Sequence, residues 1–349
     1  MAEPAEARAR VEQLLAAARV LVNPATGAGR RLRARLLETT GLSQVGIERG
    51  LTHALESEPS QAELRSLLAT TPQARRAHVL LSGNVFVAAL RAIAIGLVSS
   101  GQLSVRPSRR DPALAEALHA LAPELFRLTD ALSPELGDRV WAYGSDETLA
   151  EVRRGLRKGV WFHAHGAGFG AAVVEAAAWT PAAAQALALD TALFDQQGCL
   201  SPRVVVVRGS AADARRVSSE LARALQALEL ELPPGERDAV TLTEERRCRD
   251  AAAYAFELFG AGSGWVSCGN SLVIPPSLRC LHVVAAADPT SVLLPFAQHL
   301  TCIATDSAAL RAQLGVFSGA RLVALGQMQQ PPLDGPVDRR HGTDGELVA

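Results

Sequence analysis

The chain has 349 residues, and its 35 basic and 36 acidic side chains give a formal net charge of −1 at pH 7. Because no basic excess is present to neutralise phosphates, we expect no nucleic acid among its partners. Lysine is represented by Lys158 alone, whose neighbours Arg157 and Gly159 fit neither a Schiff-base lysine nor a phosphate loop. The hydrophobic share of 48% allows a large core, and the length allows two domains.

Neither a membrane span nor a disulfide framework is expected. The longest apolar segment, at 169–194, contains Glu175, Pro181 and Asp190, which argues against a transmembrane helix. The amino terminus lacks the charged-then-apolar layout of a signal peptide, so we expect a cytoplasmic protein. The five cysteines are an odd number without a Cys-x-x-Cys pair, which predicts free thiols rather than disulfides or a zinc site.

Residues 1–70 have the apolar spacing of helices, and from residue 77 strands and helices alternate. Strands are predicted at 78–82, 103–106, 139–143 and 160–163, with helices at 85–97, 111–121 and 146–156. This alternation predicts a parallel, doubly wound sheet, in which ligands bind at the carboxyl ends of the strands. Those ends carry Gly83-Asn84, Arg106-Pro107-Ser108, Gly144-Ser145 and His165-Gly166.

A second region starts near residue 195 with a polar turn. Strands are predicted at 203–207, 282–285 and 300–304. Helices are predicted at 211–228, from after Pro233-Pro234-Gly235 through Phe259, and at 289–299. The Pro-, Gly- and charge-rich composition from Gln327 onward predicts an extended tail.

Cys199 is the strongest candidate for a nucleophile. It follows Gly198 in a turn between a predicted helix and a strand, where a thiol can approach a ligand and nearby amides can favour the thiolate. Cys268 is the nearest competitor. The remaining cysteines have the surroundings of exposed-helix or packing residues, namely Cys248, Cys280 and Cys302.

Several segments then match one known family in order and at suitable separations. They lie at 40–43, at 80–85 followed by 105–112, at 194–202 around Cys199, and at 319–323 with Gly326. In these segments the chain resembles the LuxC-like fatty acyl-CoA reductases, a branch of the aldehyde dehydrogenase superfamily.

The resemblance implies an α/β fold of two doubly wound parallel-sheet domains with a cleft between them. We expect residues 1–194 to hold the amino-terminal helices and the nicotinamide cofactor-binding domain, and residues 195–349 the catalytic domain and the tail. It also implies a homo-oligomer that acts on acyl-CoA. Whether the acyl donor is CoA, a carrier protein or an acyl-protein synthetase-like partner stays open.

The resemblance also implies roles for individual residues. Cys199 would attack the thioester carbonyl, and Asn84 with the backbone N–H of Cys199 would hold the oxyanion. NADPH would then reduce the acyl-enzyme to the aldehyde. The implied cofactor-binding residues are Arg106, Ser108, Arg109, Gly144 and Ser145. Gly144 and Ser145 would meet the pyrophosphate at a helix N-terminus, although Asp146 and Glu147 follow directly.

Two departures from the superfamily pattern bear on the reaction. Arg106 stands where a lysine is usual, and the planar fork of arginine suits a phosphate, so we predict NADPH over NADH with Arg106 or Arg109 near the 2′-phosphate. The segment 162–167 contains no glutamate where oxidising aldehyde dehydrogenases activate water, which favours reduction.

His163 and His165 alternate on a predicted strand and therefore share one face. They could donate a proton to the nascent aldehyde oxygen or bind a phosphate, or they are satisfied histidines at a strand end. Two other functions stay open for the whole chain. One is a catalytically silent subunit that binds CoA or NADP, and the other is a thiol acyltransferase without nicotinamide.

Overall fold

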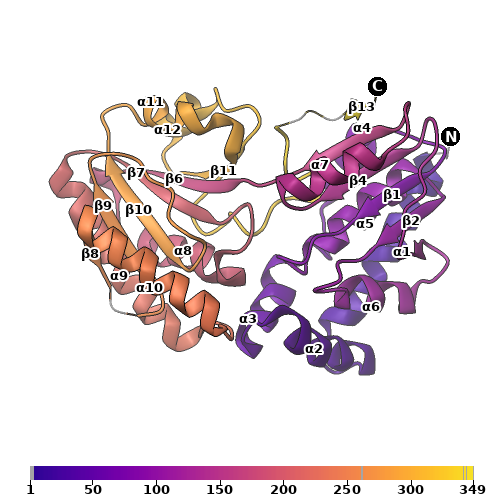
Figure 1. The fold of residues 1–349 in the computed structure, drawn as a ribbon, viewed down its shortest axis with the longest axis horizontal. Coiled ribbons are helices and arrows are strands. Elements are labelled where there is room, and N and C mark those ends of the chain that lie inside the picture. Colours follow the sequence, from indigo (N-terminus) through magenta and orange to yellow (C-terminus); the bar gives the residue numbers. More distant parts are fainter. Residues whose placement is uncertain (1–3, 261, 341, 343, 349) are drawn as a thin grey trace. The chain divides into compact units, whose positions relative to one another are not determined.

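The computed structural model describes residues 4–260, 262–340, 342 and 344–348, and the chain divides into two compact units (Figure 1). Unit 1 holds the residues up to Thr40, Gly50–Ala167, and those from Gln330 onward. Unit 2 holds Gly41–Arg49 and Gly168–Gln329. This division differs from the single boundary at 194/195 expected from the sequence, since the chain changes unit at 40/41, 49/50, 167/168 and 329/330.

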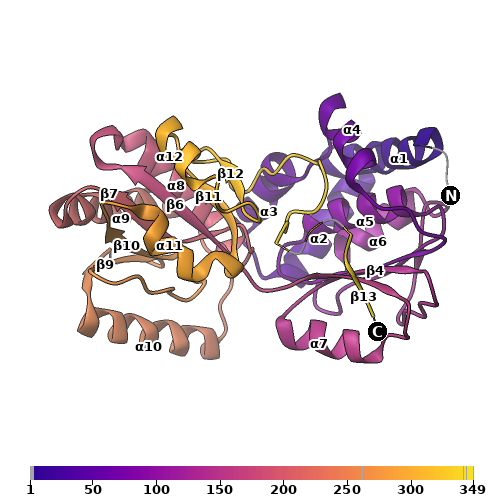
Figure 2. The same ribbon diagram turned by 90° about the horizontal axis from the view of Figure 1, so that it is seen from above.

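Unit 1 is built on a six-stranded sheet in the order β13-β5-β4-β1-β2-β3, parallel except for β13. Its strands are β1 (Ala77–Leu80), β2 (Leu103–Arg106), β3 (Arg127–Leu128), β4 (Arg139–Tyr143), β5 (Trp161–His165) and β13 (Glu346–Leu347). Its helices are α1 (Pro4–Val22), α2 (Gly27–Thr40), the π-helix η1 (Gly50–Ala54), α4 (Gln61–Thr70), α5 (Ala88–Ser99), α6 (Ala113–Leu121) and α7 (Asp146–Gly155). Figure 2 shows α7 on one face of the sheet and α5 and α6 on the other. The sheet is therefore covered on both faces, as the strand–helix alternation predicted.

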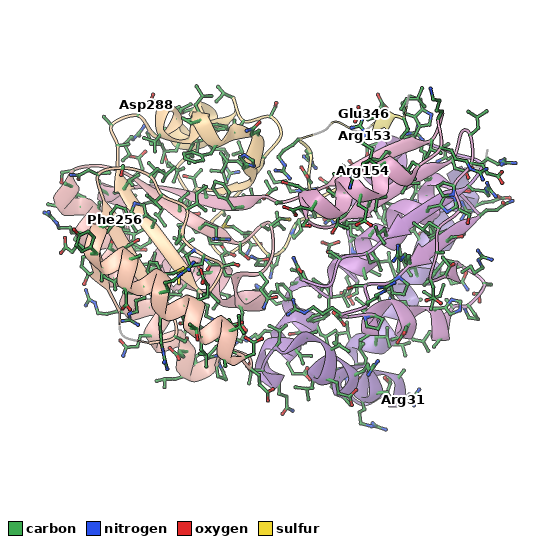
Figure 3. All side chains as sticks on the ribbon, viewed as in Figure 1. Arg31, Arg153, Arg154, Phe256, Asp288 and Glu346 are labelled. Atoms are coloured by element: carbon green, nitrogen blue, oxygen red, sulfur yellow. The ribbon has the colours of Figure 1, made fainter. Side chains whose placement is uncertain are left out.

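The predicted extended tail is fixed to unit 1 at two places. Arg91, 3% exposed in the otherwise apolar α5, pairs with Glu56 at 2.7 Å and donates to the carbonyls of Pro331 and Pro332 at 2.8 and 2.7 Å. Farther along, β13 pairs antiparallel with β5, and Arg153 of α7 bonds Glu346 (Figure 3).

Unit 2 is built on a seven-stranded sheet in the order β12-β11-β6-β7-β10-β9-β8, with only β8 antiparallel. Its strands are β6 (Phe169–Glu175), β7 (Pro202–Arg208), β8 (Glu257–Phe259), β9 (Trp265–Gly269), β10 (Cys280–Ala285), β11 (Leu300–Ala304) and β12 (Arg321–Val323). Its helices are α3 (Gln44–Arg49), η2 (Ala176–Ala178), α8 (Pro181–Ala192), η3 (Leu193–Gln196), α9 (Ala211–Glu231), α10 (Ala239–Ala255), α11 (Pro289–Leu293), η4 (Leu294–His299) and α12 (Ala308–Leu314). The valines at 204–207 are all fully buried, so both faces of this sheet are covered as well.

The fold class is confirmed, while several elements of unit 2 differ from the sequence prediction. The strands β6, β9 and β12 and the helix α12 were not predicted. The helix predicted through Phe259 is wrong at its end, because α10 stops at Ala255 and Phe259 lies in β8. Short apolar runs such as β6 carry no periodicity that separates a buried strand from a helix. No helix among the described residues is long and apolar enough to cross a bilayer.

Candidate active site

Cys199 lies half-buried in the loop between η3 and β7, as predicted. The residues leading to it, Phe194, Asp195 and Gln196, adopt φ values of 53°, 50° and 63°. Side chains other than glycine rarely occupy this left-handed region, and a run of three costs several kcal/mol at about 1–3 kcal/mol each. The surrounding contacts must therefore hold the loop in place.

Gln196 supplies one such anchor. Its side chain is fully buried, and its Oε1 accepts the backbone N–H of Cys280 at 2.8 Å. Its Nε2 donates to the carbonyls of Cys280 and Pro202 at 2.7 and 2.6 Å. These three hydrogen bonds join the loop to the first residues of β10 and β7, which indicates that Gln196 positions the loop.

Asp195 supplies a second anchor through Arg279. Its Oδ1 accepts from Nε of Arg279 at 2.8 Å, and its Oδ2 accepts the N–H of Gly235 at 2.9 Å. The Arg279 side chain is 4% exposed and also donates to the carbonyl of Leu232 at 2.8 Å. This buried ion pair joins the loop to the segments before α10 and β10, and no local sequence pattern indicates it.

The residues after Cys199 are held equally closely. The hydroxyl of Thr301 donates to the Cys199 carbonyl, and the N–H of Gly170 donates to the Ser201 carbonyl at 2.9 Å. A Cβ on Gly170 would lie 2.4 Å from the Leu200 carbonyl oxygen, so glycine is required for this approach of β6 to the loop.

The other cysteines lie in regular structure. All five cysteines are among the described residues, and Cys199 is the one outside a helix or strand. Burial raises the pKa of Cys268, Cys280 and Cys302. The pKa of Cys248 is raised mainly by burial and also by its hydrogen bond to Glu244. A raised pKa disfavours the reactive thiolate, so these thiols are poor nucleophiles.

The remaining predicted site residues all belong to unit 1, and all except His163, in the middle of β5, lie at or beyond the carboxyl ends of its parallel strands. Strands β1 and β2 run in register, with Leu80 opposite Arg106. Asn84 is exposed in the turn after β1. Gly83 approaches Ser108 so closely that a Cβ there would lie 2.5 Å from the serine hydroxyl. The structure thus brings the turn of Asn84 and the turn of Ser108 together, as predicted.

Two arginines at this edge are available to an anion. Arg106 is half-buried and Arg109 is exposed, and neither guanidinium has a hydrogen-bond or ion-pair partner among the described residues. The Ser108 hydroxyl, in contrast, already accepts the N–H of Arg110 at 3.2 Å.

The start of α7 has the predicted position but some of its polar groups are occupied. Ser145 is the N-cap, and its hydroxyl accepts the N–H of Thr148 at 3.3 Å. The N–H of Gly144 donates to the His165 carbonyl at 3.3 Å. Oδ1 of Asp146 accepts the N–H of Ala167 at 3.0 Å, so this carboxylate stabilises the loop after β5.

The environment of His163 is that of a packing residue, one of the two alternatives that the sequence left open. The ring is 5% exposed, stacks on Trp141 with centroids 4.5 Å apart, and lies 3.0 Å through Nε2 from Arg139. Burial, followed by the charge of Arg139, lowers its pKa to about 3. His163 is therefore neutral near pH 7, and the predicted role as a proton donor is not supported.

His165 lies half-buried at the end of β5 and stacks on Tyr143 with centroids 4.6 Å apart. The loop that follows is held from the tail, a feature the sequence did not indicate. Arg340 pairs with the buried Asp338 at 2.7 Å and donates to the carbonyl of Ala167 at 2.8 Å. This pair of contacts ties the tail to the end of the segment 162–167.

Comparison with known families identifies the family of the chain. A profile of the acyl-CoA reductase (LuxC) family matches residues 28–330. The chain belongs to the acyl-CoA reductase (LuxC) family. Membership makes it an oxidoreductase that acts on acyl groups or aldehydes. A sequence comparison with curated proteins gives no match.

Solved structures share the fold at low identity. An oxidoreductase from Marinobacter aquaeolei has a TM-score of 0.71 at 12% identity, over 93% of this chain and 79% of that chain. A NAD-dependent benzaldehyde dehydrogenase from Corynebacterium glutamicum has 0.69 at 14%, over 92% and 81%. A methylmalonate-semialdehyde dehydrogenase from Oceanimonas doudoroffii has 0.68 at 15%, over 95% and 79%. The chain therefore has an aldehyde dehydrogenase-like fold.

Proposed function

We propose that this acyl-CoA reductase converts an acyl-CoA thioester into the aldehyde with NADPH, through a covalent thioester on Cys199. The observation that carries the proposal is the nucleophile loop itself. Cys199 sits on a loop in a conformation that costs energy, and buried groups on three other segments hold that conformation. Such strain persists where the surrounding structure over-determines it, and it clusters at active sites.

The chemistry follows from the residue types. The Cys199 thiolate forms a bond to the thioester carbonyl carbon, and collapse of the resulting oxyanion breaks the bond to the CoA sulfur, which leaves as a thiolate. Asn84 and the backbone N–H of Cys199 are proposed to donate to that oxyanion. NADPH, when bound, supplies the hydride that reduces the acyl carbon. Release of the aldehyde returns the electron pair to the Cys199 sulfur.

The cofactor proposal is consistent with the groups at the strand ends of unit 1. Arg106 and Arg109 present guanidinium groups without partners among the described residues, which suits a 2′-phosphate. The start of α7, at Gly144 and Ser145, offers a helix N-terminus to the pyrophosphate. His165 is the remaining candidate for a proton donor, because the neutral, buried His163 does not suit that role.

A turnover assay tests the proposal. Acyl-CoAs of graded chain length are mixed with the protein and NADPH, and nicotinamide absorbance and aldehyde are followed together. We expect aldehyde in step with NADPH loss, loss of both in Cys199→Ala, and retention of both in the matched control Cys248→Ala. No NADPH consumption at any chain length contradicts the reductase proposal, and turnover that survives Cys199→Ala contradicts the nucleophile. Acylation of Cys199 without reduction points to an acyltransferase.

A further inference from the structure

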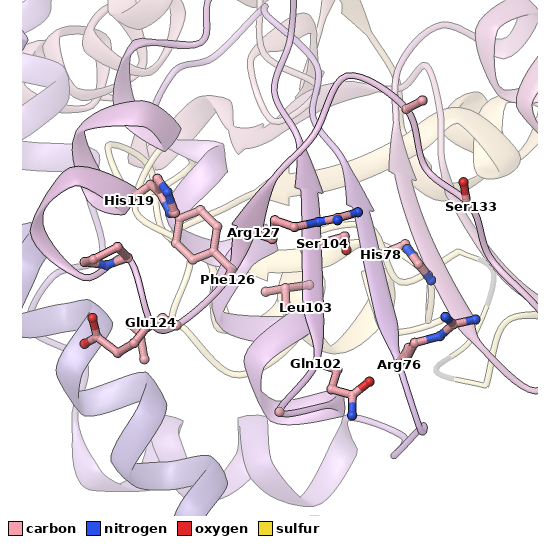
Figure 4. Close-up of a pocket in the computed structure, with 14 residues that line it drawn as sticks. Arg76, His78, Gln102, Leu103, Ser104, His119, Glu124, Phe126, Arg127 and Ser133 are labelled. Carbon is pink, nitrogen blue, oxygen red and sulfur yellow. The ribbon is translucent and has the colours of Figure 1, made fainter.

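Unit 1 contains a pocket at the edge of its sheet opposite to Asn84 and Ser108. The pocket has a volume of about 500 Å³, within the range of small-molecule sites. Its lining includes Arg76 and Gln102, which precede β1 and β2, and Arg127, which begins β3 (Figure 4). Because these strands are parallel, their amino ends lie at the edge away from the proposed cofactor residues.

A buried carboxylate fixes one wall of this pocket. Asp138 is fully buried and accepts from Nη2 of Arg76 and from the N–H of Glu135, both at 2.8 Å. Burial alone would raise the pKa of Asp138, but these hydrogen bonds outweigh it and hold the pKa below the usual value. Nε2 of His78 lies 3.2 Å from Oδ2 of Asp138. Since an ionised carboxylate only accepts, Nε2 of His78 carries the proton in this pair.

The other nitrogen of His78 is left without a protein partner. Burial, opposed by Asp138 and aided by the charges of Arg76 and Arg127, lowers the pKa of His78, so the ring is neutral at pH 7. With its proton on Nε2, the ring presents Nδ1 as a hydrogen-bond acceptor. The side chain is 6% exposed, and Nδ1 has no hydrogen-bond partner among the described residues. Because buried polar atoms are normally hydrogen-bonded, we expect a hydrogen-bond donor of a bound molecule to pair with Nδ1.

Arg127 supplies the positive charge of the pocket. Its side chain is exposed, without a hydrogen-bond or ion-pair partner in the described part of the chain. Figure 4 shows it extending across the strand of Ser104 toward His78. The carboxylate of Glu135 is occupied by Arg76 at 2.8 Å. Glu124 lies on the far side of the pocket from His78, where it accepts from the side chain of Gln13.

We propose that this pocket binds a small phosphate-bearing anion, whose phosphate oxygens accept from Arg127 while a hydroxyl of the same molecule donates to Nδ1 of His78. That hydroxyl is the P–OH of hydrogen phosphate or an alcohol beside a phosphate ester. An oxyanion without a hydroxyl, such as sulfate, satisfies Arg127 and leaves Nδ1 unpaired. The pocket should therefore prefer phosphate over sulfate, because an unsatisfied buried acceptor is costly.

Calorimetric titration of the full chain at pH 7 and constant ionic strength tests this. The ligands are inorganic phosphate, glycerol 3-phosphate and sulfate. We expect phosphate to bind the wild type at least about tenfold more tightly than sulfate, and Arg127→Gln to weaken phosphate binding at least about tenfold. His78→Gln keeps an amide donor toward Asp138 but moves the remaining acceptor, the amide oxygen, away from the position of Nδ1, so it should abolish the preference for phosphate. Tighter binding of glycerol 3-phosphate identifies an ester as the ligand, and equal binding identifies the free anion.

Two control variants separate this pocket from other sites. Arg154→Gln removes an exposed arginine at the end of α7, so it should bind phosphate like the wild type. Arg106→Gln removes the proposed cofactor contact and measures how much of the phosphate binding belongs to the cofactor site. The proposal is overturned if neither phosphate nor glycerol 3-phosphate binds, if sulfate binds as well as phosphate, or if Arg127→Gln changes nothing. It is also overturned if Arg106→Gln, rather than Arg127→Gln, removes binding. Because Arg127 is exposed, its replacement should leave the melting temperature unchanged.

Discussion

Gly170 offers a direct perturbation of the nucleophile loop. In Gly170→Ala the new Cβ would lie 2.4 Å from the Leu200 carbonyl oxygen and 3.0 Å from that of Ser201. To increase the distance between this Cβ and the Leu200 carbonyl oxygen to 3.0 Å, β6 and the loop must move apart by about 0.6 Å. The shift also strains the hydrogen bond from Gly170 to Ser201, at present 2.9 Å. Overpacking of this kind costs about 1–3 kcal/mol of unfolding free energy.

The same shift should also reduce activity. Leu200 is the residue after Cys199, and a displacement near 1 Å at a reacting group can cost about a hundredfold in rate. Denaturant unfolding and single-turnover acyl transfer measure the two effects. Gly155→Ala is the matched control, because its Cβ meets nothing within 4 Å and should lower neither quantity. Wild-type unfolding free energy and rate in Gly170→Ala would refute the reasoning.

Three further predictions follow from the same contacts. Arg91→Met leaves the Glu56 carboxylate without its buried partner and frees the carbonyls of Pro331 and Pro332 in the tail. We therefore expect a loss of about 3 kcal/mol in unfolding free energy and faster proteolysis after residue 330. Proteolysis at the wild-type rate would contradict the anchoring role of Arg91. Burial raises the pKa of Asp190 to about 7 in the folded chain, so the folded state binds the extra proton and its contribution to stability falls as pH rises from about 4 to 7. The difference in unfolding free energy between wild type and Asp190→Asn should therefore change by up to about 1.4 kcal/mol per pH unit in that window, and a constant difference would contradict the raised pKa. Arg106→Ala should raise the KM for NADPH at least about tenfold with little change for NADH, whereas equal use of both cofactors by wild type and variant would contradict the phosphate role.

Local sequence patterns predicted where the site residues lie better than they predicted the contacts that hold those residues in place. Alternation of strands and helices fixed the strand ends at Asn84, Ser108 and Gly144, because parallel strands place their carboxyl ends at one edge. Gly198 and the polar residues around it located the turn of Cys199. The bond between Asp195 and Arg279 joins residues 84 positions apart, and Arg340 reaches Ala167 across 173 positions. No local pattern carries such pairings, and three successive left-handed residues without glycine have no sequence signature.

The histidines show the same limit. The alternation of His163 and His165 correctly placed both rings on one face, where they stack on Trp141 and Tyr143 of the neighbouring strand. The contact of His163 with Arg139, and the tail residue Gly345 above the ring, depend on long-range packing. That packing, and not the strand pattern, decides that His163 is buried and neutral.

The most direct test of the central claim separates acyl transfer from reduction. The protein is incubated with an acyl-CoA without NADPH, and the mass of the intact chain and of the peptide containing Cys199 is measured. We predict a gain of one acyl group on Cys199 with release of one CoA thiol, followed by loss of the acyl group and appearance of one aldehyde when NADPH is added. An acyl group on another residue, or aldehyde formed with no acylation of Cys199, would contradict the account.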